Sequence, residues 1–433
     1  MSTLYTTDGS LAAVYRTDGT MVWGSPGGAN PSEPETPAEP PTPPEGPLMN
    51  VATRMAAANN GTRPEGGTSG TMAATRHLIA VDVDTITVSW VTTHGYGFDT
   101  SGTYRAAVAV NDGPVVPVTV DGGQQTWRIT KPLSTIPTVT TSDPVRVPAY
   151  AGDTIAVYVW AVPDEAGKSI SSDLISRTPG DLYGTGDWGS ALSGLKPTAQ
   201  MGGWSYRPAR IVSTSNLSSW LGVGDSIIQG RWSYVDQALD MRGLPGVKSA
   251  QGGEAHMYFP GRWNERCASH VPTAPYMIDQ YGVNGAGRMP TAGLGFWNHA
   301  KANGVKYLVK TTIAPTTSQG ASTMNHADAQ LDNAWLRDGA PLTADKKTAL
   351  ETGTTDPTAV RCDVIRPDGT IKKGTGGHLI DAVSDTAARI ESSPGYVSDE
   401  AAAVIGVDKL HPSPAVHAML AERLARDLEI LGF

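Results

Sequence analysis

The stretch Trp220-Leu221-Gly222-Val223-Gly224-Asp225-Ser226-Ile227 decides the fold of the second half of the chain. Its apolar run ends in glycine and a helical pattern over 226–239 follows directly, which predicts a strand, a tight turn and a helix. Further strand candidates alternate with helical segments, the last of which spans 413–431; the candidates are 247–251, 276–283, 305–313 and 378–383. Such alternation indicates a parallel sheet covered on both faces. We therefore predict an α/β three-layer domain over residues 216–433.

Ser226 is the candidate nucleophile of this domain. In an open parallel sheet, sites form beyond the carboxyl ends of the strands, where loops meet helix N-termini. Ser226 occupies such a turn, close to backbone N–H groups that no helical carbonyl satisfies. A serine hydroxyl there is unreactive until a base removes its proton. The alternative is that Asp225 or Ser226 only caps the helix.

The candidate base lies far along the chain, in Asp408-Lys409-Leu410-His411-Pro412. Pro412 favours extended backbone at His411, just before the final helix. Asp408 can accept a hydrogen bond from the imidazole, which would set its tautomer and stabilise the imidazolium. Five other histidines have no convincing catalytic partner in the sequence, and we expect them to be structural or on the surface: His94, His256, His270, His299 and His326.

These residues resemble the sequence blocks of the SGNH/GDSL hydrolases. Gly224-Asp225-Ser226-Ile227 is similar to the family's Gly-Asp-Ser-Leu block, with Ile in place of Leu, and Asp408-Lys409-Leu410-His411 matches its Asp-x-x-His block. The resemblance covers about residues 220–433. It implies a flavodoxin-like parallel sheet and a serine esterase activity.

The family's middle blocks supply an oxyanion hole. Its glycine would fall in Gln251-Gly252-Gly253-Glu254, after the second strand candidate, and we choose Gly253 over Gly252. Asn284 matches the asparagine of the Gly-x-Asn-Asp block that follows the third strand candidate. Gly285 stands where the family has Asp, which weakens the match but leaves the proposed donor in place.

The resemblance implies a mechanism in which three side chains have distinct roles. Ser226 attacks an ester carbonyl, His411 takes the proton and passes it to the leaving alcohol, and Asp408 orients His411. The N–H groups of Ser226 and Gly253 and the side-chain amide of Asn284 would hold the oxyanion. We expect no cofactor and no metal, since the chain shows no His and Asp at metal-ligand spacing.

The sequence before residue 216 divides into three predicted parts. Residues 1–24 contain a short β-hairpin repeat, in which Asp8-Gly9 recurs ten positions later, and would serve as an attachment segment. Residues 25–50 are rich in Pro and Glu and predict a stiff linker. Residues 51–215 predict a β-sandwich or jelly-roll accessory domain, because short strand candidates such as 77–91 alternate with turn signals.

Composition excludes several classes of function. The net charge is −9, which argues against a nucleic-acid-binding surface, since phosphate contacts need clustered Lys and Arg. Cys267 and Cys362 are too few for a disulfide scaffold or a structural zinc site, and whether they pair is open. No run of apolar residues is long enough to span a membrane. The N-terminus does not resemble a secretory signal peptide.

Our leading hypothesis is a serine esterase that removes acetyl or other short acyl groups from a cell-surface or cell-wall polysaccharide. The chain has 11 tryptophans and 14 tyrosines but only 4 phenylalanines. This excess suits contact with sugars, although filling the core would also explain it. The alternatives are a non-catalytic glycan- or receptor-binding tail protein and an esterase for lipids or polyesters. The N-terminal repeat and linker resemble the attachment end of an actinobacteriophage tail protein. We therefore expect an extracellular or virion-associated protein, with virion tail proteins or further copies of itself as partners.

Overall fold

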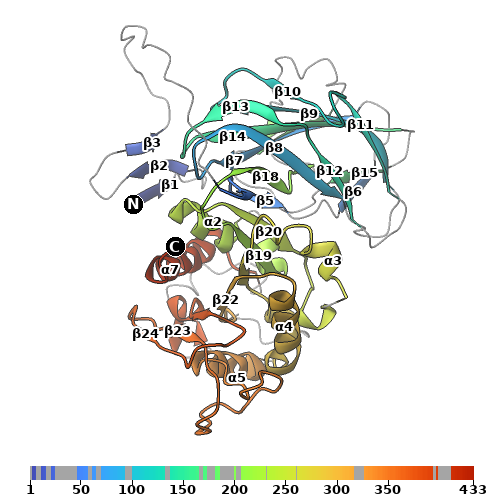
Figure 1. The fold of residues 1–433 in the computed structure, drawn as a ribbon. Helices are drawn as coiled ribbons and strands as arrows, with labels where there is room; N and C mark the ends of the chain where they lie inside the picture. The colour runs from blue at the N-terminus through green and yellow to red at the C-terminus, as the bar shows by residue number, and fades with distance from the viewer. Residues whose placement is uncertain are drawn as a thin grey trace. The chain divides into compact units, whose positions relative to one another are not determined.

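The computed structural model of the chain divides into two compact units, Met1–Leu217 and Ser218–Phe433 (Figure 1). It describes residues 2–5, 11–15, 21–24, 46–56, 61–64, 70–92, 100–131, 137–164, 169–172, 181–185, 199–200, 206–230, 232–259, 261–315, 326–393, 396–397 and 411–433. The four-part division expected from the sequence stays a prediction, because most of the 25–50 linker lies outside these residues.

Unit 1 contains strands and turns, with no helix among its described residues. The strands are β1 (Ser2–Tyr5), β2 (Leu11–Tyr15), β3 (Met21–Gly24), β4 (Leu48–Asn50), β5 (Met55–Ala56), β6 (Gly61–Pro64), β7 (Thr71–Leu78), β8 (Val83–Thr92), β9 (Thr100–Val110), β10 (Val116–Val118), β11 (Trp127–Lys131), β12 (Thr138–Thr141), β13 (Val145–Ala149), β14 (Thr154–Pro163), β15 (Ser169–Ser172), β16 (Leu182–Thr185), β17 (Ala199–Gln200) and β18 (Arg210–Thr214).

The strands after β3, apart from β5, form two sheets that are antiparallel except for one parallel contact between β15 and β9. One runs β17-β16-β7-β14-β9-β15-β6, with β10 and β11 also on β9, and the other runs β12-β8-β18-β4, with β13 also on β8. Trp90 of β8 stacks on Trp127 of β11 at 4.9 Å between ring centroids, so the two sheets face each other across an aromatic core. The jelly-roll topology stays a prediction.

One expected strand of unit 1 is wrong in its bounds. The candidate 77–91 spans the end of β7, a turn and most of β8, because its Val, Ile and Thr residues continue through a turn that carries no glycine. The sequence pattern of Asn, Asp and Gly at 111–113 does lie in a turn: Asn111 and Asp112 adopt φ of 48° and 59° between β9 and β10.

Unit 2 alternates strands with helices. Its strands are β19 (Trp220–Gly224), β20 (Gly246–Ala250), β21 (Tyr276–Asp279), β22 (Tyr307–Thr311), β23 (Asp363–Ile365), β24 (Ile371–Lys372), β25 (Ala382–Ser384), β26 (Glu391–Ser393) and β27 (Tyr396–Val397). Its helices are α1 (Ser226–Gln229), α2 (Tyr234–Arg242), α3 (Trp263–Arg266), α4 (Leu294–Ala302), α5 (His326–Arg337) and α7 (Pro414–Ile430). Short helical turns lie at η2 (His256–Tyr258), η3 (Val283–Gly285), η4 (Met289–Gly293) and η5 (Ala387–Arg389).

The central sheet of unit 2 runs β24-β23-β25-β22-β21-β19-β20, and its strands from β23 to β20 pair in parallel. The chain moves from β19 to β20 on one side and then to β21 on the other, which places a switch in strand order at β19. In register, Gly224 pairs with Ala250, and Val223 pairs with Asp279. The loops after β19, β20 and β21 therefore leave the sheet at one edge, where open α/β sheets form their binding crevices.

Helices cover both faces of this sheet, as the alternating pattern predicted. Figure 1 shows α2 and α7 on one side of the strands and α4 on the other. Trp220 of β19 is fully buried, and Tyr276 and Phe433 pack against its ring at 5.4 and 4.9 Å between centroids. Trp90, Trp263 and Trp297 are also fully buried, which favours a core role for these tryptophans over sugar contact.

The helix expected over 226–239 is two helices. Gly230 ends α1 in an extended conformation, and Ser233 starts α2 by accepting a hydrogen bond from the Asp236 N–H at 3.3 Å. Cys267 and Cys362 are buried free thiols. Within the described part of the chain, no helix is long and apolar enough to cross a membrane.

Candidate active site

Ser226 stands at the sharp turn between β19 and α1. Asp225 caps α1, since its Oδ1 accepts a hydrogen bond from the Ile227 N–H at 2.9 Å. A Cβ on Gly224 would clash with Gln280 Oε1 and would lie 2.7 Å from Ile228 Cγ1, so only glycine fits at the end of β19. Ser226 itself is half-buried. The cap that we considered as an alternative is thus supplied by Asp225, and it leaves the Ser226 hydroxyl available.

The fold brings His411 to this serine across 185 positions of sequence. His411 Nε2 lies 2.8 Å from Ser226 Oγ. Two residues after His411, Ser413 caps α7 through the Val416 N–H, and Pro414 occupies the first turn of that helix. The start of α7 therefore holds the histidine next to the β19 turn. Asp408, the proposed orienting residue, lies outside the described residues.

The loop after β20 distinguishes the two glycines proposed for the oxyanion hole. The Gln251 N–H donates to the Gly224 carbonyl, and the Glu254 N–H donates to the Gln251 carbonyl, both at 3.1 Å. The Gly252 N–H donates to Gln229 Oε1 at 2.7 Å. The Gly253 N–H has no acceptor within the described parts of the chain, and Gly253 is exposed with φ of 76°. This pattern favours Gly253 over Gly252 as the oxyanion donor.

The other two proposed donors also keep an N–H group available. The Ser226 N–H is at the first position of α1 and has no acceptor among the residues described. Asn284 Nδ2 donates one hydrogen bond to the Glu254 carbonyl at 3.1 Å, and an amide nitrogen carries a second hydrogen. The bond to Glu254 holds Asn284 against the loop that carries Gly253. A Cβ on Gly252 would lie 3.6 Å from Ser226 Cβ, so the β20 loop directly adjoins the serine.

The Glu254 carboxylate connects the loop after β20 to neighbouring residues through hydrogen bonds. Its Oε2 accepts from the Tyr281 hydroxyl at 2.9 Å, and its Oε1 accepts from Arg262 Nη1 at 2.9 Å. Glu254 is buried, and a buried carboxylate is stable only when paired and hydrogen-bonded. The loops after β20 and β21, which carry Gly253 and Asn284, are therefore joined to each other by both the backbone and the side chain of Glu254.

Charge near Ser226 is dominated by buried groups. Burial raises the pKa of Asp225 to about 6, against the lowering effects of the Ile227 N–H, Gln280, Lys310 and His411. The Asp225 N–H donates to Gln280 Oε1 at 3.0 Å, and Oδ2 of Asp225 is buried without a partner in the described structure. Asp225 thus braces the turn, with a carboxyl group whose burial opposes ionisation.

His256, which we expected to be structural or on the surface, is buried and takes part in a polar cluster around Asp279. His256 Nε2 lies 2.8 Å from Asp279 Oδ2, and Trp297 Nε1 donates to the same oxygen at 2.7 Å. Burial opposes ionisation of Asp279, but His256 and Lys310 hold its pKa below the ordinary value. Lys310 Nζ donates to the carbonyls of Asp279 and Tyr281 at 3.1 and 2.6 Å. The sequence signal for this cluster was Asp279 at the end of an apolar strand, which needs a buried partner.

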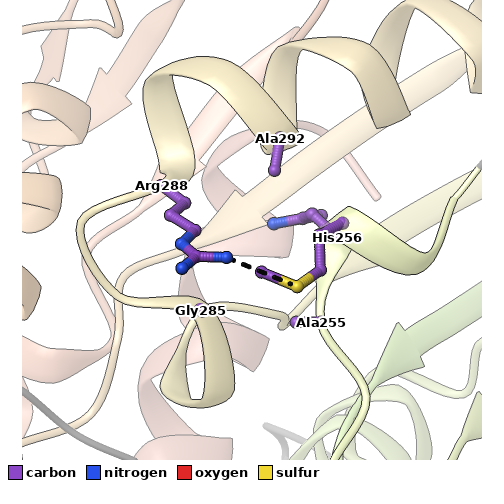
Figure 2. A pocket seen from close by; sticks show the side chains of 7 residues that line it. Ala255, His256, Gly285, Arg288 and Ala292 are labelled. Atoms are coloured by element: carbon purple, nitrogen blue, oxygen red, sulfur yellow. Dashed lines mark hydrogen bonds between the residues drawn. The ribbon is translucent and has the colours of Figure 1, made fainter.

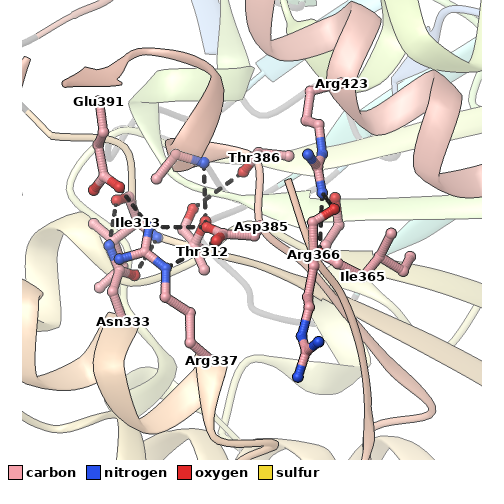
Figure 3. A network of polar contacts seen from close by, with 12 residues as sticks. Thr312, Ile313, Asn333, Arg337, Ile365, Arg366, Asp385, Thr386, Glu391 and Arg423 are labelled. Carbon is pink, nitrogen blue, oxygen red and sulfur yellow. Dashed lines mark hydrogen bonds and ion pairs between the residues drawn. The ribbon is translucent and has the colours of Figure 1, made fainter. Parts of the chain in front are cut away.

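The segment after β25, which precedes His411 in the chain, is anchored by a polar network (Figure 3). Arg337 of α5 donates to both carboxylate oxygens of Asp385 at 2.9 Å, and it pairs with Glu391 at 2.5 Å. Thr312 Oγ1 donates to Asp385 Oδ1 at 3.0 Å. These bonds fix the start of the connection that ends at α7.

The structure describes only some of the other histidines named from the sequence. His270 is buried and His299 is half-buried against Trp263, while His94 and the side chain of His326 lie outside what the structure describes. Three or more metal-ligating side chains do not come together anywhere in the described ranges.

No protein-family model and no curated protein matches the chain. Solved structures do match. A candidate SGNH hydrolase from Slackia heliotrinireducens is 19% identical, covers 49% of this chain and all of its own, and has a TM-score of 0.32. A family two carbohydrate esterase from Clostridium thermocellum, in complex with cellohexaose, is 12% identical over 89% of this chain and 99% of its own, with a TM-score of 0.32. A lipase/acylhydrolase from Enterococcus faecalis is 14% identical over 49% of this chain and 96% of its own, again at 0.32.

These three structures are described as a hydrolase, a carbohydrate esterase and a lipase/acylhydrolase. Because these TM-scores lie below 0.5, we base the function on the geometry of the site itself.

Proposed function

We propose that unit 2 is a serine esterase that hydrolyses short acyl esters of a polysaccharide, with acetyl esters as its preferred substrates. The observation that carries this proposal is the 2.8 Å contact between Ser226 Oγ and His411 Nε2 beside the N–H groups of Ser226 and Gly253 and the amide of Asn284. A nucleophile, its base and donors for an oxyanion are the parts that acyl transfer needs.

The chemistry follows from these positions. Ser226 Oγ attacks the ester carbonyl while His411 Nε2 takes its proton, and the resulting oxyanion accepts hydrogen bonds from the three donors. The tetrahedral intermediate then releases the sugar alcohol, which receives the proton from His411, and leaves an acyl group on Ser226. Water, deprotonated by His411, attacks this acyl group in turn and regenerates the serine. In this proposal Asp408 stabilises the imidazolium.

Hydrolysis of 4-nitrophenyl acetate tests the serine mechanism. Ser226→Ala and His411→Ala should each lower kcat by at least 1,000-fold, the order lost when a triad member is removed. Ser218→Ala and His299→Ala are the matched controls and should retain turnover. Turnover by Ser226→Ala would refute the proposal, and glycan binding without any turnover in the unchanged protein would favour a tail receptor-binding function.

The acyl group is tested by a chain-length series of nitrophenyl esters. We expect the highest kcat/KM at two to four carbons. A rise beyond about eight carbons would favour a lipid or polyester substrate, because each buried methylene adds roughly 0.8 kcal/mol.

We also propose that the protein is extracellular or virion-associated and that unit 1 binds glycan. The grounds for this proposal are the N-terminal repeat and the two facing sheets of unit 1.

A further inference from the structure

Lys310 is a fully buried lysine of β22 that the proposed mechanism does not use. Its Nζ donates to three backbone carbonyls, those of Asp279 at 3.1 Å, Tyr281 at 2.6 Å and Thr311 at 2.9 Å. An ammonium has three hydrogens, so these bonds use all of its donors. The Asp279 carboxylate, whose Oδ1 lies 3.8 Å from Nζ, opposes the lowering of the lysine pKa by burial. Lys310 is therefore paired and fully hydrogen-bonded, as a buried charge must be.

Two of the three carbonyls flank Gln280, which directly follows β21. The last residue pair between β21 and β22 is Asp279 with Lys310, so the Tyr281 carbonyl lies beyond the end of the ladder between these strands. The Tyr281 N–H donates to Asp279 Oδ1 at 3.0 Å. The ion pair between Lys310 and Asp279 therefore holds the whole segment 279–281 after the strand has ended.

Gln280 connects this segment to the nucleophile turn, which is the turn between β19 and α1 that carries Ser226. The Gln280 N–H donates to the Val223 carbonyl at 2.8 Å, and its Oε1 accepts from the Asp225 N–H at 3.0 Å. Asp225 directly precedes Ser226 and caps α1. The backbone that Lys310 holds is therefore fixed directly against the nucleophile turn.

Tyr281 connects the same segment to the proposed oxyanion donors. Its hydroxyl donates to Glu254 Oε2 at 2.9 Å, and the Glu254 carbonyl accepts from Asn284 Nδ2 at 3.1 Å. Gly285, which follows Asn284, lies beside Ala255 (Figure 2), and a Cβ on Gly285 would lie 3.3 Å from the Ala255 Cβ. The loop that carries Asn284 thus leaves the sheet at Tyr281 and packs against the β20 loop.

Lys248 offers a comparison within the same unit, because it is a second buried lysine of the central sheet. Its Nζ pairs with Asp236 Oδ2 at 2.6 Å and donates to the Gly230 carbonyl at 3.3 Å. Gly230 follows α1, and Asp236 lies in α2. Lys248 thus shares the burial and the ion pair of Lys310 but binds a different part of the unit.

We infer that Lys310 is a positioning residue for catalysis, which places Asn284 relative to the nucleophile turn by holding residues 279–281. The inference rests on the proposed esterase function and adds to it a residue that acts through others. Loss of the three Nζ bonds would let the segment shift, and a displacement of about 1 Å at a catalytic group can lower the rate by about 100-fold.

Steady-state hydrolysis of 4-nitrophenyl acetate by Lys310→Met measures the effect, since methionine keeps an unbranched side chain and removes the ammonium. We expect kcat to fall by about 10- to 100-fold at nearly constant KM, because oxyanion donors act on charge that develops in the transition state. Lys310→Met also leaves the buried Asp279 carboxylate unpaired, which is destabilising. If this variant does not fold, the same change is made together with Asp279→Asn, which removes both charges, and Asp279→Asn alone becomes the reference.

A double-mutant cycle with Asn284→Ala separates positioning from general destabilisation. Because Lys310 acts through Asn284, Lys310→Met should lower kcat by no more than threefold further when Asn284→Ala is already present. Lys248→Met is the matched control and should change kcat by the same factor with and without Asn284→Ala. A further loss above threefold for Lys310→Met, or an unchanged kcat in Lys310→Met alone, would overturn the inference.

Hydrogen exchange followed by mass spectrometry separates this inference from the esterase proposal. In the loop at 282–288, the Gly285 N–H donates to the Gly282 carbonyl at 3.2 Å and the Arg288 N–H donates to the Gly285 carbonyl at 3.1 Å. Lys310→Met should speed exchange in this loop at least tenfold and leave α2 unchanged, whereas Lys248→Met should speed exchange in α2 instead. If the unchanged protein hydrolyses no ester, the esterase proposal fails, and exchange still decides whether Lys310 holds this loop. No rise at 282–288, or an equal rise in α2, would refute it.

Discussion

Gln229 should control catalysis without touching the substrate. It is the last residue of α1, its side chain is 3% exposed, and its Oε1 accepts the Gly252 N–H at 2.7 Å. This bond holds the loop in which the Gly253 N–H is left without an acceptor in the described structure. Gln229→Ala removes the acceptor and frees the loop to turn.

Gln229→Ala should lower both the free energy of unfolding and kcat. An unsatisfied, partly buried N–H costs about 1–3 kcal/mol of unfolding free energy. Complete loss of one oxyanion donor lowers kcat by about 100- to 1,000-fold, so a loosened Gly253 should lower it by roughly 10- to 100-fold. KM should change little, because these donors act on charge that develops in the transition state.

Steady-state hydrolysis of 4-nitrophenyl acetate, with urea unfolding in parallel, measures both losses. Gln237→Ala is the matched control, since it removes a hydrogen bond from Gln237 Nε2 of α2 to the carbonyl of Trp232, which precedes that helix. It should cost stability and spare kcat. Equal losses of kcat in the two variants would mean that destabilisation alone explains the effect. An unchanged kcat in Gln229→Ala would refute the positioning role.

Three further predictions concern the same edge of the sheet. Asn284→Ala should lower kcat by about 100- to 1,000-fold at nearly constant KM, and a loss below threefold in a nitrophenyl acetate assay would remove Asn284 from the oxyanion hole. Gly224→Ala should lower the free energy of unfolding by about 1–3 kcal/mol, because its Cβ would meet Ile228 at 2.7 Å; Gly230→Ala, which meets nothing within 4 Å, should be tolerated in the same urea experiment. Asp225 has a folded-state pKa of about 6, above its ordinary 3.8, so the stabilisation from its protonation is complete below about pH 3.8 and is lost as pH rises through about 6. Asp225→Asn lacks this loss, so its free energy of unfolding should rise relative to the unchanged protein by roughly 2 kcal/mol between pH 4 and 7, and a constant difference would contradict the buried carboxylate.

The sequence pattern predicted secondary structure correctly where neighbouring residues alone decide the backbone conformation. The run before Ser226 became β19, and Gly224 is glycine because Ile228 and Gln280 leave no room for a Cβ. The same kind of pattern placed the turn at Asn111 and the final helix after Ser413. It failed where a helical pattern continued through Gly230, since periodicity does not register a break of a few residues.

The sequence by itself determined the order of the elements and the residue types available at the carboxyl edge of the sheet. Only the tertiary structure decided which of them meet: His411 reaches Ser226 because α7 begins beside the β19 turn, a contact between residues 185 positions apart. It also decided which glycine N–H is already engaged, because here Gln229 supplies an acceptor to the Gly252 N–H. The contact between His256 and Asp279 is likewise made by the tertiary structure, because the two residues lie 23 positions apart. Hydrogen bonding and charge compensation depend on what surrounds a group in space, and distant parts of the chain provide those surroundings.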